Sequence, residues 1–245
     1  SQIAFARVGA SYFLINGKHR MTAIVAYGKP AEFSVVVYEC ADMDEVRSLY
    51  ARFDNVQRAR SSAQILAASD LAGQLGVSTG IAKATYASVP LLLNGLRFIY
   101  HNDPTTARLR VDLGLIDFRI SAALAWADQA KLYERCVDSS QGKSRAKMLQ
   151  ATVVAPALYT LKHCKASAVE FWTGVAANDG LRRGDPRHTL HDYILSTAMK
   201  NKEVGSFISA ISMAWNAWAE NRKLVIIRAT SASKVSFIGT PMRVR

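Results

Sequence analysis

The residues best suited to chemistry begin with a short polar segment that follows an apolar run. It reads Asn16-Gly17-Lys18-His19-Arg20 and places three basic side chains on the first turn of a predicted helix. The free backbone N–H groups and the positive end of the helix dipole already favour an anion there. Basic side chains oppose that dipole, so they suit a bound phosphate better than they suit helix stability alone. The segment therefore predicts a phosphate-binding turn.

A second polar segment, Asp54-Asn55-Val56-Gln57-Arg58, follows the next predicted helix. The Asn-Gly pair of the first segment is a turn signal, since both residues tolerate a positive φ. Asp42 is the expected N-cap of the second helix, with Glu45 completing a capping box. Before the first segment we expect two paired strands, over Ile3–Val8 and Tyr12–Ile15. A helix over Lys18–Tyr27 follows, which is expected to bury Met21, Ile24 and Val25. A strand over Phe33–Tyr38, covered on both faces, and a helix over Met43–Phe53 then lead to the second segment.

Together the two segments resemble the ParB/sulfiredoxin superfamily. Gly17-Lys18-His19-Arg20-Met21-Thr22-Ala23 is similar to the G-E-R-R-x-R-A box of the ParB partition proteins, and the second segment is similar to their E-N-x-Q-R box. In that family the first box binds nucleotide phosphates, and the Asn of the second box helps to hold a magnesium ion. The resemblance covers roughly the first quarter of the chain. Family members carry a further strand and helix upstream, so the resemblance also implies that residues before Ser1 are missing.

The resemblance implies that the chain binds a nucleoside triphosphate, CTP or ATP, together with Mg²⁺. Asn55 is the implied metal ligand. In the alternative in which the same pocket does chemistry, the candidate catalytic residues are His19, as acid or base, and Asp54, as metal ligand or base. The implied nucleotide contacts are Gly17, Lys18, His19, Arg20, Asn55, Gln57 and Arg58.

Three residues depart from the ParB boxes. Lys18 replaces an acidic residue, His19 replaces an Arg, and Asp54 is one methylene shorter than the family Glu. Because Asp54 occupies the position tied to hydrolysis, the sequence supports binding more strongly than turnover.

Other branches of the superfamily can be compared at the same positions. The reactive Cys of the sulfiredoxin G-C-H-R loop is replaced by Lys18, so a thiol nucleophile is absent and sulfinic-acid repair is disfavoured. Free-serine kinases, nucleases of the same fold and the D-G-Q-H-R proteins linked to DNA phosphorothioation stay open. An ordinary βαβ turn with a solvated basic helix start is the non-functional alternative.

Composition bounds the class of protein. The chain has 245 residues, half of them apolar, and a formal net charge of +12. Such a charge on a folded protein predicts a polyanionic partner, DNA first. The three cysteines, Cys40, Cys136 and Cys164, contain no C-x-x-C pair, which indicates reduced thiols in a cytoplasm. The apolar runs are too short to span a membrane. We expect a cytoplasmic protein of bacterial or phage origin.

From Ser61 onward the pattern becomes helical. Residues 70–85 resemble a helix-turn-helix, with Ile81, Ala82 and Lys83 on the recognition helix, and a plain helical hairpin explains them equally well. The basic residues assigned to nucleic-acid contact are Lys83, Lys143, Arg145, Lys147, Arg182, Arg183 and Arg187.

Further patterns complete the helical region. A long helix is expected over Phe118–Val137, and a helix over Val204–Ala219 whose two tryptophans anchor the core. Asp185 is the expected N-cap of a helix that begins at Pro186. Strands within 224–238 are expected to form a hairpin or to return to the N-terminal sheet.

The sequence therefore predicts an α+β chain. A small ParB/sulfiredoxin-like α/β domain over residues 1–60 is followed by a mostly helical domain over 61–245 with a short C-terminal β-hairpin. The leading functional hypothesis is a nucleotide-gated, DNA-associated protein of the ParB type. The alternatives are a ParB-fold nuclease, ATPase or kinase, and a catalytically dead scaffold that binds DNA or protein. The sequence does not specify the oligomeric state, and a homodimer is compatible with it.

Overall fold

The computed structural model describes residues 3–28, 32–52, 69–96, 116–140, 142–196, 204–228, 235–241 and 243–244. The chain divides into two compact units, Ser1–Ser69 and Asp70–Arg245, which we call the N-terminal unit and the helical unit. The domain boundary that the sequence predicts near Ser61 falls in 53–68, outside the described residues.

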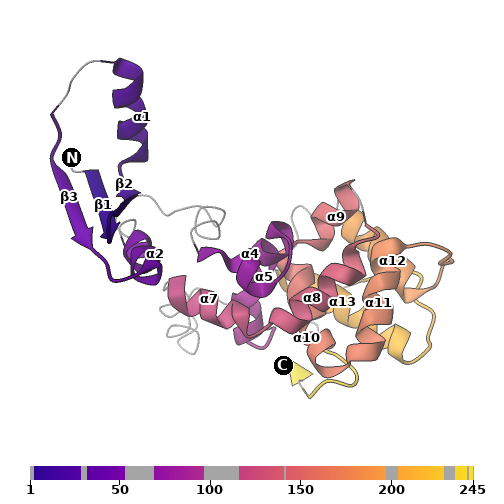
Figure 1. The fold of residues 1–245 in the computed structure, drawn as a ribbon. Helices are drawn as coiled ribbons and strands as arrows, with labels where there is room; N and C mark the ends of the chain where they lie inside the picture. Colours follow the sequence, from indigo (N-terminus) through magenta and orange to yellow (C-terminus); the bar gives the residue numbers. More distant parts are fainter. Residues whose placement is uncertain are drawn as a thin grey trace. The chain divides into compact units, whose positions relative to one another are not determined.

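The N-terminal unit contains a three-stranded sheet in the order β2-β1-β3 (Figure 1). The central strand β1 (Ile3–Val8) pairs antiparallel with β2 (Ser11–Asn16) and parallel with β3 (Val35–Glu39). Helix α1 (Lys18–Tyr27) connects β2 to β3, and helix α2 (Met43–Arg52) follows β3. The expected order of elements and the expected pairing of the first two strands are both present.

Helix α2 begins as its sequence predicts. Asp42 Oδ1 accepts hydrogen bonds from the backbone N–H groups of Asp44 and Glu45, each at 2.9 Å. The Glu45 carboxylate accepts a hydrogen bond from the Ala41 N–H at 2.8 Å, which completes a capping box one residue earlier than its usual form. The helix then packs on β1 and β2 and buries Val46.

Two burial predictions for this unit are wrong. Val25 on α1 is 76% exposed, and Val35 and Val37 on β3 are 51% and 43% exposed. The reason is that α2 packs on β1 and β2, where Ile15 is buried, whereas β3 is an edge strand of the described sheet. An apolar pattern shows which side chains favour burial, but it does not supply the layer that buries them.

The helical unit consists of packed helices (Figure 1). A short two-stranded sheet follows them in the chain. Its helices are α4 (Leu71–Leu75), α5 (Thr79–Leu93), α7 (Ile116–Leu124), α8 (Ala127–Val137), α9 (Gly142–Met148), α10 (Ala151–His163), α11 (Lys165–Ala177), α12 (Pro186–Leu195) and α13 (Val204–Ala219). Strands β4 (Val235–Ser236) and β5 (Arg243–Val244) pair antiparallel.

Helix α10 and a cluster of aromatic side chains form the centre of this unit. From residue 153 to residue 161, α10 is buried on all sides, as expected of a helix that is apolar all round. Phe171 makes edge contacts with Trp172 and Trp215, each with ring centroids 5.2 Å apart. Trp172 Nε1 donates a hydrogen bond to the buried hydroxyl of Thr160 at 2.9 Å. The predicted role of the α13 tryptophans as core anchors is confirmed for Trp215, which is buried.

Two element predictions for the helical unit are wrong. The single helix expected over Phe118–Val137 is divided into α7 and α8, because Trp126 leaves helical geometry with φ −112° and ψ 17°. No strand forms over residues 224–227. Leu224 instead donates to the Gly184 carbonyl at 2.9 Å and accepts from Thr189 Oγ1, so its backbone is held by α12 and the loop before it. The terminal hairpin therefore consists of β4 and β5.

The described fold is a small three-stranded sheet with two helices, followed by a mostly helical region. The predicted α+β class is confirmed at this level. None of the described helices has the length and apolarity that crossing a bilayer requires.

Candidate phosphate-binding sites

The first polar segment forms a tight turn between β2 and α1. Gly17 has φ +103° and ψ 15°, a left-handed conformation that residues with a Cβ rarely adopt. A Cβ at this position would lie 3.2 Å from Ile3 Cγ1 and 3.3 Å from Cγ2. The turn therefore needs glycine twice over, for its backbone angle and for its packing against β1.

The first turn of α1 carries basic side chains and no acidic one. Among the described residues, no side chain caps the start of the helix at Gly17, so its first N–H groups keep their capacity to bind an anion. Lys18 is exposed and Arg20 is half-buried. The backbone of His19 belongs to α1, and its side chain lies outside the described residues.

The second polar segment is not described by the structure. Helix α2 ends at Arg52, and Asp54, Asn55, Gln57 and Arg58 lie outside the described residues. The convergence of the two segments on one nucleotide therefore stays a prediction.

A shallow groove of about 490 Å³ lies along β2 and α1. Its lining is mainly apolar, with Leu14, Met21 and Val25 among its residues, and Lys18 is the one cation among the described residues that line it. Such a surface suits an apolar or planar group better than it suits a phosphate.

The segment compared with a helix-turn-helix consists of α4, a turn at Gly76 and α5. Ile81 and Ala82 are completely buried, so only Lys83 of the three predicted recognition residues is exposed. The Glu134 carboxylate accepts a hydrogen bond from the Ser78 N–H at 2.8 Å, which places a negative charge where a recognition helix approaches DNA. The geometry favours the helical-hairpin alternative.

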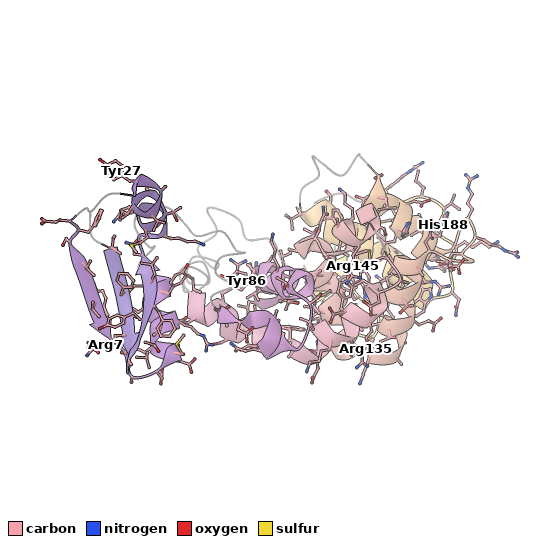
Figure 2. The ribbon with its side chains drawn as sticks, turned by 45° about the horizontal axis from the view of Figure 1, so that its top comes forward. Arg7, Tyr27, Tyr86, Arg135, Arg145 and His188 are labelled. Carbon is pink, nitrogen blue, oxygen red and sulfur yellow. The ribbon has the colours of Figure 1, made fainter. Side chains whose placement is uncertain are left out.

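The basic residues around α9 are partly committed within the protein. Arg145, labelled in Figure 2, donates to the Val137 carbonyl at 3.0 Å and lies 3.7 Å from an Asp138 carboxylate oxygen. Lys147 is half-buried, and the side chain of Lys143 lies outside the described residues. This segment is a helix with limited phosphate-binding capacity.

The third basic cluster, Arg182, Arg183 and Arg187, borders a hollow of about 630 Å³. We call this hollow the arginine groove. Its wall is the loop between α11 and α12, which carries the exposed Arg182 and Arg183. Asp185 caps α12 as predicted, accepting a hydrogen bond from the Arg187 N–H at 2.8 Å. Pro186 is the first residue of the helix.

Arg187 is paired with carboxylates of the protein itself. Its guanidinium donates to both carboxylate oxygens of Asp185, at 3.1 and 2.8 Å, and lies 3.8 Å from Glu170 of α11. Hydrogen bonding from Arg187 lowers the pKa of Asp185, and the same bonds raise the pKa of Arg187. Arg187 is thus part of an ion pair within the protein, and its contact with nucleic acid stays a prediction.

Sequence reasoning missed two cations of the arginine groove. Arg222 and Lys223 follow α13 and line the same hollow, because the hydrogen bond from Leu224 to Gly184 brings them to the loop before α12. Arg222 is ion-paired with Glu220. In the sequence, Arg222 and Lys223 are visible as a basic pair that follows α13. Only the fold shows that this pair lines the same hollow as Arg183.

The two histidines of α12 have structural partners. The His188 ring nitrogens lie 2.9 Å from Asn178 Oδ1 and 3.4 Å from Asp192 Oδ2. His191 Nδ1 lies 2.7 Å from the Val175 carbonyl oxygen. Among the described residues there is no group of three or more His, Cys, Asp or Glu side chains placed to hold a metal ion.

Comparisons with protein-family models, with curated proteins and with solved structures gave no match.

Proposed function

We propose that the N-terminal unit binds a nucleoside triphosphate, CTP or ATP, with Mg²⁺, and that the chain is a DNA-associated protein of the ParB type. The observation that carries the proposal is the left-handed Gly17 turn, which opens α1 with basic side chains and without a side-chain cap among the described residues. A helix start with these properties is suited to phosphate.

In this proposal the backbone N–H groups of the first turn of α1 bind phosphate oxygens. Lys18 and Arg20 neutralise their charge, with the planar Arg20 guanidinium able to bind two oxygens at once. Gly17 fits this role because a Cβ there would fill the space between the turn and Ile3. From the second segment, Arg58 would add charge, Gln57 a polar contact and Asn55 an oxygen ligand for Mg²⁺.

The proposed association with DNA rests on charge. The net charge of +12 favours a polyanion, and the arginine groove gathers exposed cations on the helical unit. Because the geometry disfavours a helix-turn-helix, the arginine groove is the best candidate for DNA contact among the surfaces that the structure describes.

Equilibrium titration of the protein with CTP, ATP, GTP and UTP, each with Mg²⁺, tests the nucleotide proposal. We expect binding of at least one of them and its loss in Arg20→Ala. Arg7→Ala is the matched control, because Arg7 is an arginine of the same unit that is ion-paired with Glu39 at 2.9 Å on the sheet. Absence of binding to every nucleotide overturns the proposal, as does equal loss in both variants.

A further inference from the structure

The arginine groove shares part of its lining with a second hollow. The second hollow has a volume of about 360 Å³ and is bordered by Cys164, Trp215 and Gly239. Glu170, Trp218 and Asn221 line both hollows. Each of these three side chains is therefore in contact with both hollows.

Trp218 is a rigid aromatic surface at this junction. It lies in the last turn of α13, and its ring packs against Phe171 and Trp215 with centroid distances of 5.4 and 5.6 Å. It is half-buried, so part of the ring stays accessible from the hollows that it lines. A fixed and partly exposed indole is a suitable stacking partner for a planar ring.

The cations of the groove divide into committed and available ones. Arg187 and Arg222 are held by carboxylates. Arg182, Arg183 and Lys223 are exposed, and none of them has an ion pair with another described residue. These three give the groove an excess of positive charge beside Trp218.

The acidic side chains of the groove do not cancel this excess. Asp185 is bound by Arg187 through both of its oxygens, and Glu170 lies 3.8 Å from the same guanidinium. One guanidinium offsets one of these two carboxylates, so the three cations Arg182, Arg183 and Lys223 still exceed the one acidic charge that is left in the described lining.

We propose that the arginine groove binds single-stranded nucleic acid, with an unpaired base stacked on Trp218 and the flanking phosphates on Arg182, Arg183 and Lys223. This proposal specifies the DNA contact of the proposed function, on which it rests. A duplex keeps its base faces stacked on each other, so a recessed tryptophan cannot reach them. A single strand exposes base faces, and a basic groove with an aromatic platform is the general solution for binding it.

The test uses fluorescence anisotropy of a labelled oligo(dT) of about 12 nucleotides, within the usual range of single-strand site sizes. We expect Trp218→Leu to weaken binding roughly 5- to 150-fold, the range for loss of one stacked base. Trp218→Phe keeps a ring and should retain most of the affinity. Quenching of tryptophan emission by the bound strand should diminish in both variants.

Charge variants keep the test independent of any folding defect at Trp218. Arg182→Ala/Arg183→Ala removes two exposed side chains and should lower the salt slope of binding by about 1.4, since each phosphate contact on a single strand contributes roughly 0.7. Arg135→Ala is the matched control, an exposed arginine of α8 that does not line the groove. It should leave the slope almost unchanged.

The outcomes separate this proposal from the nucleotide site. Binding that is unchanged in the Trp218 and arginine variants overturns the groove and leaves DNA association intact. Tighter binding to duplex of the same sequence also overturns it. If the wild type binds neither the single strand nor the duplex, the groove and the DNA association are both overturned. Failure of the triphosphate titration alone removes only the N-terminal site.

Discussion

Replacing Gly17 by Ala perturbs the turn on which the nucleotide proposal depends. Gly17 has φ +103°, which lies beyond the left-handed helical region centred near +57°. Backbone strain of this kind costs on the order of 1–3 kcal/mol. The new Cβ would also lie 3.2 Å from Ile3 Cγ1, which adds overpacking against β1. We expect Gly17→Ala to destabilise the N-terminal unit by about 2–4 kcal/mol.

Gly9 provides the matched control within the same sheet. It has φ +58°, and a Cβ there would meet no atom within 4 Å. Gly9→Ala therefore adds only the left-handed backbone cost of about 1–2 kcal/mol. The difference between the two variants measures the packing and the more extreme φ of Gly17. Only Gly17→Ala should also abolish binding of triphosphate.

Hydrogen exchange followed by mass spectrometry measures the effect where it occurs. Since about 1.4 kcal/mol corresponds to a factor of ten, β1 amides of Gly17→Ala should exchange at least tenfold faster than wild type. All four tryptophans lie in the helical unit, so their emission should report unchanged unfolding there. A Gly17→Ala protein with wild-type exchange and wild-type nucleotide binding would refute the reasoning.

Three further substitutions test the helical unit by urea unfolding followed through tryptophan emission. Asp185→Ala removes a helix cap and the partner of Arg187, and should lower the free energy of unfolding by about 2 kcal/mol. The pKa of Asp185 is lowered in the folded protein, so the full loss should be seen above the ordinary carboxyl pKa. The loss should shrink as the pH falls through the lowered pKa. Trp172→Phe removes a hydrogen bond donated to a buried threonine hydroxyl and should cost about 1–3 kcal/mol, seen as a lower urea midpoint with an unchanged slope. Glu134→Gln keeps an acceptor for the Ser78 N–H but removes its charge, and should cost only about 0.5 kcal/mol; a loss above 2 kcal/mol would mean that the carboxylate does more than cap α5.

Local signals in the sequence were sufficient to place several elements. Helix α1 occupies Lys18–Tyr27 as predicted, because an Asn-Gly turn precedes it and Gly28 ends it in a left-handed conformation with φ +65°. Helix α13 occupies Val204–Ala219 as predicted, because its apolar periodicity is strong and uninterrupted. Caps, turns and long periodic runs depend on neighbours within a few residues, so a sequence carries them directly.

The burial of α1 and β3 was not predictable in this way. Val25 and Val37 are exposed although their patterns are those of covered elements. The division between α7 and α8 at Trp126 likewise depends on how both helices pack, since its residues are compatible with a continuous helix.

The candidate site was only partly visible for a similar reason. The sequence grouped Arg182, Arg183 and Arg187 because they are close in the chain. It could not show that Glu170, from another helix, lies beside Arg187, or that Lys223 joins the groove. Whether a basic side chain is already paired with a carboxylate depends on the tertiary structure. That pairing decides which residues of a basic segment can bind a phosphate.

The two proposed sites belong to different units, so an influence of nucleotide on nucleic-acid binding takes the form of a coupling free energy. Reciprocity then fixes its consequences. If a bound triphosphate tightens the groove for a single strand by some factor, the strand tightens the Gly17 site for triphosphate by the same factor. Couplings of this kind are usually about 1–3 kcal/mol, or roughly 5- to 150-fold in affinity. A triphosphate that binds the chain equally well with and without a bound strand shifts nothing, however tightly it binds. The chain acts as a nucleotide-gated binder only if these paired affinities move together, and as two independent binding units joined in one polypeptide if they do not.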